Sequence, residues 1–93
     1  MSDNTVRIGH LVSSIQGRDS GRYYLVVEIE SESRVRVADG AGRKVESPKR
    51  KNVKHLKFYD LVAGEVMEKM LRGRRINNAD VRKELKSLVE SGK

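Results

Sequence analysis

The stretch that decides the fold is YYLVVEIE, residues Tyr23–Glu30. It is rich in aromatic and β-branched side chains, which favour the pleated, half-buried surface of a β-strand. Side chains alternate between the two faces of a strand, so the odd-numbered residues share one face and the even-numbered residues share the other. The even-numbered face ends in Glu28 and Glu30, which predicts that this face becomes solvated toward the end of the strand.

Shorter strand patterns lie on both sides of this segment. Val6–Ser14 predicts a first strand, and Gly17–Gly21 (GRDSG) predicts the turn that follows it, because glycine and aspartate favour turns. Arg34–Ala38 alternates between arginine and valine. We therefore expect Val35 and Val37 to point into the core.

The remaining strands are expected between residues 39 and 58. Asp39–Gly42 (DGAG) is a hairpin signal, because Asp and Gly adopt the backbone conformations that tight turns require. Arg43–Glu46 would then form the returning strand, and Val53–Phe58 would form the last one. Five short strands linked by tight turns usually close into a small barrel, which removes their unpaired edges.

The C-terminal third of the chain has a helical pattern. Apolar residues recur at spacings of three and four over residues 61–71, which predicts an amphipathic helix with Asp60 as its N-cap and Gly73 as its end. A second helix is expected to open at the pair Asn77-Asn78, since asparagine favours the N-cap position. Its apolar residues form a single stripe: Val81, Leu85, Leu88 and Val89.

We therefore predict a mainly β protein with C-terminal helices, in three parts. Residues 1–5 form a flexible tail, residues 6–59 form the barrel, and residues 60–93 form a helical hairpin packed on or beside the barrel. A chain of 93 residues is long enough for one such domain. It contains no cysteine, which excludes disulfides and thiolate metal sites.

The sequence has no segment with the character of an export signal or a membrane span. The polar Met1–Thr5 lacks the apolar stretch of a signal peptide. No apolar run approaches the roughly 20 residues that cross a bilayer. We expect a cytoplasmic protein without a membrane partner.

The basic residues are concentrated in Arg43–Lys57, RKVESPKRKNVKHLK. Seven lysines and arginines stand there against one acid, Glu46, so this segment carries +6 of the net charge of +7. A concentrated positive field points to a polyanionic partner. Pro48 disfavours a continuous helix, so the run is interpreted as a basic loop that enters a short strand.

Several motifs together resemble the KOW proteins of the ribosomal L-fourteen-e, L-six-e and L-twenty-seven-e group. Residues Ile8–Val27, with a glycine-bearing strand and a Gly-Arg-Asp turn, resemble the KOW motif itself. Three later runs are similar to that group's turn, basic run and final strand: Val37–Gly40, Pro48–Asn52 and Lys54–Leu56. Ile76–Lys83 resembles the tail of small bacterial relatives.

The resemblance implies an SH3-like KOW barrel that binds structured RNA, usually ribosomal RNA of the large subunit. It implies a ribosomal or ribosome-associated protein, with ribosomal proteins as further partners and a monomer off the ribosome. Together with the charge pattern it nominates ten RNA-binding residues: Arg18, Arg22, Arg43, Lys44, Lys49, Arg50, Lys51, Asn52, Lys54 and His55.

Some of the polar residues have structural alternatives. Asn52 either reads a base edge or caps its turn. Arg34 and Arg36 either extend the positive surface or pair with a glutamate of the neighbouring strand, Glu28 or Glu30. Both alternatives remain open at the level of the sequence.

Four further features are interpreted from their surroundings. Arg72–Arg75 (RGRR) either joins the basic surface or stabilises the end of the first helix. Asp19 is expected to stabilise its turn. Tyr23 is expected in the core and Tyr24 under the helices, so phosphate and shape recognition rank above base stacking.

No combination of residues indicates catalysis. The serines lack a paired histidine and the carboxylates are scattered, so we expect neither an enzyme nor a cofactor. The histidines, His10 and His55, lack the spacing of a metal site, and His10 is expected to be structural. The alternatives to RNA binding are a protein–protein adaptor of the translation or transcription machinery, using the barrel and the helical hairpin, and sequence-neutral DNA binding.

Overall fold

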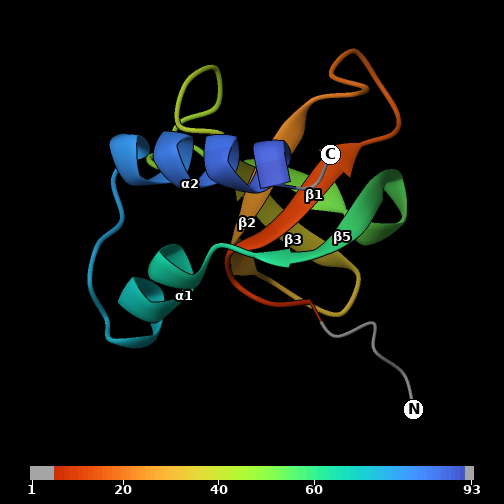
Figure 1. Ribbon diagram of the computed structural model, residues 1–93. Helices are drawn as coiled ribbons and strands as arrows, with labels where there is room; N and C mark the ends of the chain where they lie inside the picture. The colour runs from red at the N-terminus through yellow and green to blue at the C-terminus, as the bar shows by residue number, and fades with distance from the viewer. Residues whose placement is uncertain (1–5, 92–93) are drawn as a thin grey trace.

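The computed structural model describes residues 6–91, which form a five-stranded antiparallel sheet and two C-terminal helices (Figure 1). The strands are β1 (His10–Ser14), β2 (Tyr23–Ile29), β3 (Arg34–Ala38), β4 (Lys49–Asn52) and β5 (Leu56–Val62), in the spatial order β4-β3-β2-β1-β5. The prediction of a mainly β protein with C-terminal helices is confirmed. The predicted flexible tail, residues 1–5, lies outside the described residues.

The two edge strands of the sheet are consecutive in the chain. β4 and β5 are separated only by a short 3-10 helix, η1 (Val53–His55), although they lie at opposite ends of the strand order. The sheet must therefore curl until its two edges approach each other at η1. Within residues 6–91 no ladder pairs β4 with β5, so the sheet is not closed and the predicted SH3-like barrel is not confirmed.

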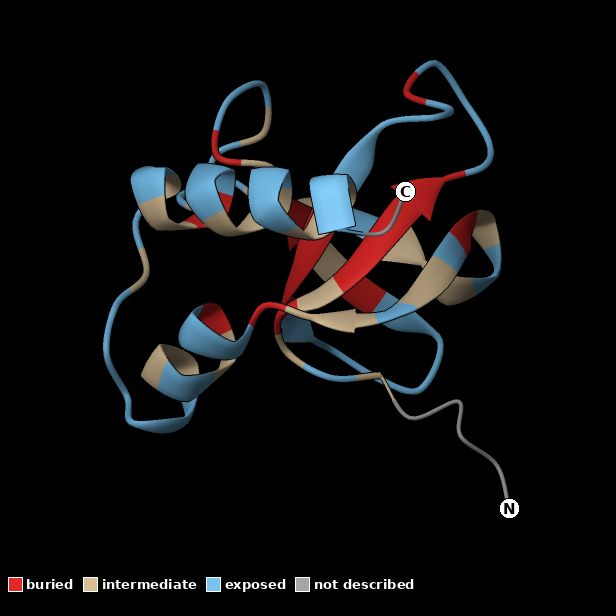
Figure 2. Ribbon diagram, viewed as in Figure 1, coloured by how far each residue is buried: buried red, intermediate tan, exposed pale blue. Residues whose placement is uncertain are grey.

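Each face of the curled sheet carries its own apolar cluster. On one face the buried residues are Val12, Tyr24, Val26, Val35, Val37 and Leu56. On the other face Leu11 and Leu25 pack against the helical segment through Ala63, Val66 and Val81. As a result both faces of β2 are buried along residues 24–27, and β2 is the central strand of the fold (Figure 2).

The helices cover the second of these faces. α1 spans Gly64–Leu71 and α2 spans Asn78–Ser91, with α2 lying across the sheet (Figure 1). The expected stripe of α2 is confirmed, because its apolar side chains all belong to the second cluster: Val81, Leu85, Leu88 and Val89.

The start of α2 is fixed by a reciprocal cap. The Asp80 amide donates to Asn77 Oδ1 at 2.8 Å, and the Asn77 amide donates to Asp80 Oδ2 at 3.2 Å. Two of the amides that a helix start leaves without partners are thereby satisfied. The asparagine predicted to cap this helix is therefore Asn77.

The strand predicted over Arg43–Glu46 is wrong. These residues belong to the loop 39–48, and the returning strand is β4, which begins at Lys49. Asp39 Oδ1 accepts the amides of Ala41 (2.9 Å) and Arg43 (2.8 Å), which holds the start of the loop in a compact turn. Residues 44–48 then lead the chain to β4, where pairing with β3 begins at Lys49.

The predicted start of the first helix is also wrong. Asp60 lies inside β5, and α1 begins at Gly64 with Ala63 as its N-cap. The β-branched and aromatic residues of β5 pair with β1 as far as Val62, so strand pairing outweighs the helical spacing there. The predicted boundary between residues 59 and 60 thus falls within a strand.

Candidate nucleic-acid interface

A buried carboxylate, Asp19, ties the β1–β2 loop (residues 15–22) to the edge strand β4. Its oxygens lie 3.1 Å from Lys49 Nζ and 3.1 Å from Lys51 Nζ. The hydroxyls of Ser14 and Tyr24 donate to the same carboxylate, each at 2.9 Å. Asp19 is 8% exposed, whereas the Lys49 side chain is 37% exposed, so this polar cluster lies at the mouth of the first apolar core with Lys49 on its solvent side.

The charge state of this cluster follows from its contacts. Burial by itself would raise the pKa of Asp19, but hydrogen bonds from Lys51, Ser14, Tyr24 and Lys49 outweigh it and hold the pKa well below its ordinary value. Burial, and then the hydrogen bond to Asp19, raise the pKa of Tyr24 to about 12. At neutral pH the cluster is therefore an anion surrounded by two ammonium groups and two hydroxyls.

The alternation of β4 explains why these two lysines face inward. Lys49 pairs with Val37 and Lys51 pairs with Val35, so both lysines share the face of the buried valines. The Lys51 side chain is only 10% exposed. Inward-pointing charges are a known way to protect an edge strand from pairing with another chain. Lys49 and Lys51, nominated for RNA, are placed by the structure as counter-ions of Asp19.

Arg50 points to the opposite face of β4 and joins a second ionic cluster. Its Nε lies 3.0 Å from Glu30 Oε1, and Arg36 binds the same glutamate. Hydrogen bonding from Arg36 is the main cause that lowers the pKa of Glu30. Of the two alternatives for Arg36, pairing across the strands is the one found.

Three more of the residues predicted to bind RNA lie at η1: Asn52, Lys54 and His55. Asn52 caps η1, because its Oδ1 accepts the Lys54 amide at 3.0 Å, so the capping alternative is the one found. The half-buried His55 uses its carbonyl to accept the Ile15 amide at 3.0 Å. Lys54 is exposed beside the start of the β1–β2 loop.

The other nominated residues gather at one end of the sheet. Arg18 and Arg22 are exposed in the β1–β2 loop, and the loop 39–48 carries Arg43, half-buried, and Lys44, exposed. The two loops adjoin because β1 ends, β2 begins and β3 ends at the same end of the sheet. A Cβ added at Gly42 would lie 3.5 Å from the Arg22 guanidinium, so Arg22 bridges them. We call these two loops the two-loop surface.

The loop 39–48 is held in place by α2. Gly40 has a φ of +78°, and a Cβ there would collide with the Asn78 carbonyl oxygen and lie 2.9 Å from Arg82 Cγ. Arg82 in turn donates to the Gly40 carbonyl, and Asn78 Oδ1 accepts the Val45 amide at 2.9 Å. Only glycine permits this close approach of loop and helix.

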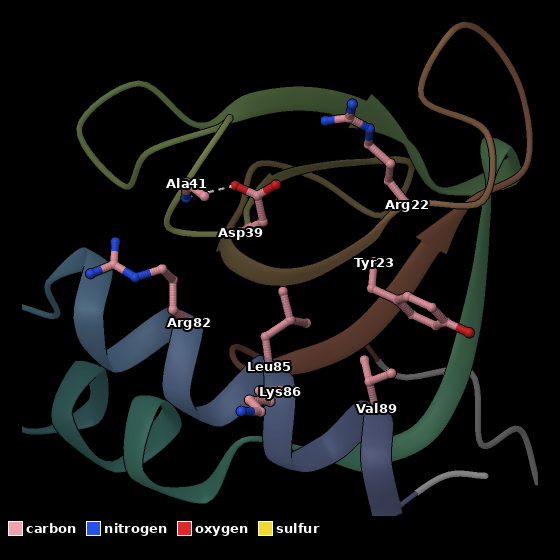
Figure 3. A pocket seen from close by; sticks show the side chains of 8 residues that line it. All are labelled: Arg22, Tyr23, Asp39, Ala41, Arg82, Leu85, Lys86 and Val89. Carbon is pink, nitrogen blue, oxygen red and sulfur yellow. Dashed lines mark hydrogen bonds between the residues drawn. The ribbon is translucent and has the colours of Figure 1, made fainter.

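A shallow groove of about 380 Å³ runs between the two-loop surface and α2 (Figure 3). Its lining residues are Arg22, Tyr23, Asp39, Ala41, Arg82, Leu85, Lys86 and Val89. Arg82 and Lys86 are not among the binding residues predicted from the sequence. They stand four residues apart on α2, beside the apolar stripe, and that helical spacing is the signal that places them on one side of the helix.

The prediction that Tyr23 lies in the core is wrong. Tyr23 is 38% exposed, whereas Tyr24 is 3% exposed. Tyr24 is buried in the first cluster, on the face opposite the helices, so the prediction that it packs under them is wrong as well. Hydrogen bonding with Tyr59 raises the pKa of Tyr23 above its ordinary value, so its phenol is neutral at physiological pH.

The segment Arg72–Arg75 does not join the two-loop surface. It follows α1, away from the two loops, which lie at the other end of the molecule (Figure 1). Arg72 forms an exposed ion pair with Glu68 at 3.3 Å, at the end of α1. Gly73 has a φ of +73°, a conformation typical of the residue that ends a helix.

Two further properties concern only the described part of the chain. Residues 6–91 bring together no group of three histidine, aspartate or glutamate side chains able to hold a metal ion. Neither α1 nor α2 is long and apolar enough to cross a membrane.

Fold and site define a small protein with a curled sheet, two covering helices and a cationic two-loop surface. No protein-family model matches the chain. It is 43% identical over 54 residues to a Bacillus subtilis (strain 168) protein named "Putative ribosome-binding protein YbzG". The match covers 58% of this chain and 73% of that protein, so the chain belongs to the same family.

Proposed function

We propose that this protein is ribosome-associated and binds structured RNA of the large subunit, as KOW-type proteins do, by the two-loop surface. The observation that carries the proposal is the set of exposed cations at the adjoining ends of β1, β2 and β3, in a chain whose relative is named for ribosome binding. A ribosome-associated role also agrees with a cytoplasmic location.

The proposed chemistry is recognition of phosphate by side chains on rigid loops. Arg18 and Lys44 form no ion pair among the described residues, so no internal counter-ion must be displaced when they meet a phosphate. The Asp19 cluster holds one of the two loops and α2 holds the other. Phosphate contacts from fixed loops position a protein on structured RNA without requiring a base sequence.

The adaptor alternative has less support. It would use the apolar face of the helical hairpin, but the stripe of α2 and Val66 of α1 are packed against the sheet. Sequence-neutral DNA binding uses the same cations and is separated from RNA binding by competition. We propose binding without catalysis.

The test is co-sedimentation with purified ribosomes at low salt, comparing two charge-matched double variants. Arg18→Glu with Lys44→Glu should weaken ribosome binding by roughly tenfold or more, because it removes two phosphate contacts and adds repulsion. Arg74→Glu with Arg75→Glu makes the same change of net charge after α1 and should bind almost as well as the wild type. Equal loss in the two variants would contradict the assignment of the surface.

Two neighbouring cations are unsuited to this test. Replacing Lys49 and Arg50 by glutamate would place negative charge beside Asp19 and Glu30. A loss of ribosome binding in that variant would report damage to the fold as much as loss of a contact. Competition by duplex DNA with an affinity equal to that of large-subunit ribosomal RNA would exclude the RNA assignment.

A further inference from the structure

An aromatic pair, the exposed Tyr23 and the half-buried Tyr59, lies beside the groove. The rings of Tyr23 and Tyr59 have centroids 5.8 Å apart and are tilted by 45°. Tyr59 is fixed in place, because its hydroxyl lies 3.0 Å from Ser13 Oγ and Lys57 Nζ lies 5.1 Å from its ring centroid. Tyr23, which is 38% exposed, therefore contacts a ring whose orientation is fixed.

The position of this pair follows from the register of the sheet. Ser13 of β1 is paired with Tyr23 on one side and with Lys57 on the other, so these three side chains share one face. Tyr59 lies two residues beyond Lys57 and shares the same face. This is the face that α2 covers, and Tyr23 lines the groove together with Val89 of the last turn of α2.

The charged side chains that line the groove beside the pair are mainly cationic. Arg22 and Lys86 line the groove on opposite walls, with Arg22 next to Tyr23 in the chain and Lys86 on α2 (Figure 3). Lys57 lies on the other side of the pair, over Tyr59. The acid in the groove, Asp39, is engaged by the loop amides of Ala41 and Arg43.

We propose that Tyr23 is a stacking site for one unpaired RNA base, with Arg22 and Lys86, which line the same groove, as contacts for the neighbouring phosphates. Aromatic side chains on a sheet bind bases by stacking on their π-faces, and arginine and lysine beside them bind the backbone. The cations favour this occupant over an apolar peptide, which would bury charge without a counter-ion. The inference rests on the proposed function and adds a base contact to it.

The test compares two probes of equal length and charge: an oligoadenylate decamer and an abasic ribose-phosphate decamer, each carrying the same fluorescent label. Binding is measured by fluorescence anisotropy at constant salt. The wild type should bind the oligoadenylate about tenfold more tightly, a preference of about 1.4 kcal/mol, because one base stacks on Tyr23. Tyr23→Ala should lose this preference and keep its affinity for the abasic probe, whereas Tyr23→Phe should keep the preference.

Three outcomes would overturn the stacking site. They are equal affinity of the wild type for both probes, a preference that survives in Tyr23→Ala, and failure of the wild type to bind either probe at low salt. Circular dichroism of each variant distinguishes loss of the fold from loss of the ring. A wild type that co-sediments with ribosomes but does not prefer bases leaves the proposed function standing and removes only this inference.

Discussion

Asp19 is the internal counter-ion of two lysines that lie about thirty residues later in the chain, Lys49 and Lys51. The GRDSG sequence correctly predicts a turn, and alternation places Lys49 and Lys51 on one face of a strand. Neither pattern shows that this face meets the turn, because that depends on the curl of the sheet. The phosphate contacts predicted from charge density therefore include two lysines that neutralise an internal carboxylate. Charge density identifies the sign of a surface but not which of its cations are already paired.

At the residue scale we predict that Asp19→Asn lowers the free energy of unfolding by about 3 kcal/mol at neutral pH, because Lys51, whose side chain is 10% exposed, then lacks a counter-ion. The pKa of Asp19 is lowered by folding, so its contribution to stability is present above the ordinary pKa of 3.8 and is lost as the pH falls below it. Urea denaturation at pH 7 and near pH 3 should thus show a smaller loss of stability on acidification in the variant than in the wild type.

The matched control is Asp60→Asn, at an exposed position of β5. It should leave the stability at neutral pH nearly unchanged, because Asp60 forms no ion pair among residues 6–91. An Asp19→Asn variant that loses as much stability on acidification as the wild type would show that other carboxylates carry the acid sensitivity.

At the element scale, the loop 39–48 shows that the alternation of side chains does not by itself predict every strand correctly. The turn at Asp39–Gly42 is correctly predicted, but Arg43–Glu46 contains one apolar residue, Val45, and has little to bury as a strand. Its contacts are made with α2, whose start lies more than thirty residues later in the chain. Strands β2 and β3 and the stripe of α2 were predictable, because each has an unambiguous apolar pattern of its own.

We predict that Gly40→Ala destabilises the protein by about 2 kcal/mol or more, because it adds a steric clash with α2 to the cost of a positive φ. Gly73→Ala is the control: Gly73 also has a positive φ, of +73°, but a Cβ there meets nothing within 4 Å. Thermal unfolding followed by circular dichroism should therefore give the larger loss for Gly40→Ala. Equal losses would mean that the loop moves away from α2 without cost.

At the scale of the whole molecule, the net charge of +7 predicts a polyanionic partner without locating it. Three groups stand out among the cations: those paired with Asp19 or Glu30, those of the two-loop surface, and those of the turn after α1. The sequence run Arg43–Lys57 contributes to the first two groups, and the β1–β2 loop adds Arg18 and Arg22 to the second. In the proposed function, the cations that would release counter-ions from RNA are the exposed loop cations, together with Lys86 of α2 at the proposed base site.

The salt dependence of RNA binding should report this division. With on the order of four phosphate contacts from the two loops, the logarithm of the association constant for large-subunit ribosomal RNA should fall with the logarithm of salt concentration at a slope of about −3. Arg18→Gln should make that slope less steep by roughly 0.7 to 0.9, the effect of one contact, whereas Arg75→Gln should leave it unchanged. Filter-binding titrations at several salt concentrations measure both slopes. A change in slope of equal size in Arg75→Gln would show that the RNA also contacts the turn after α1, so that the binding surface extends beyond the two loops.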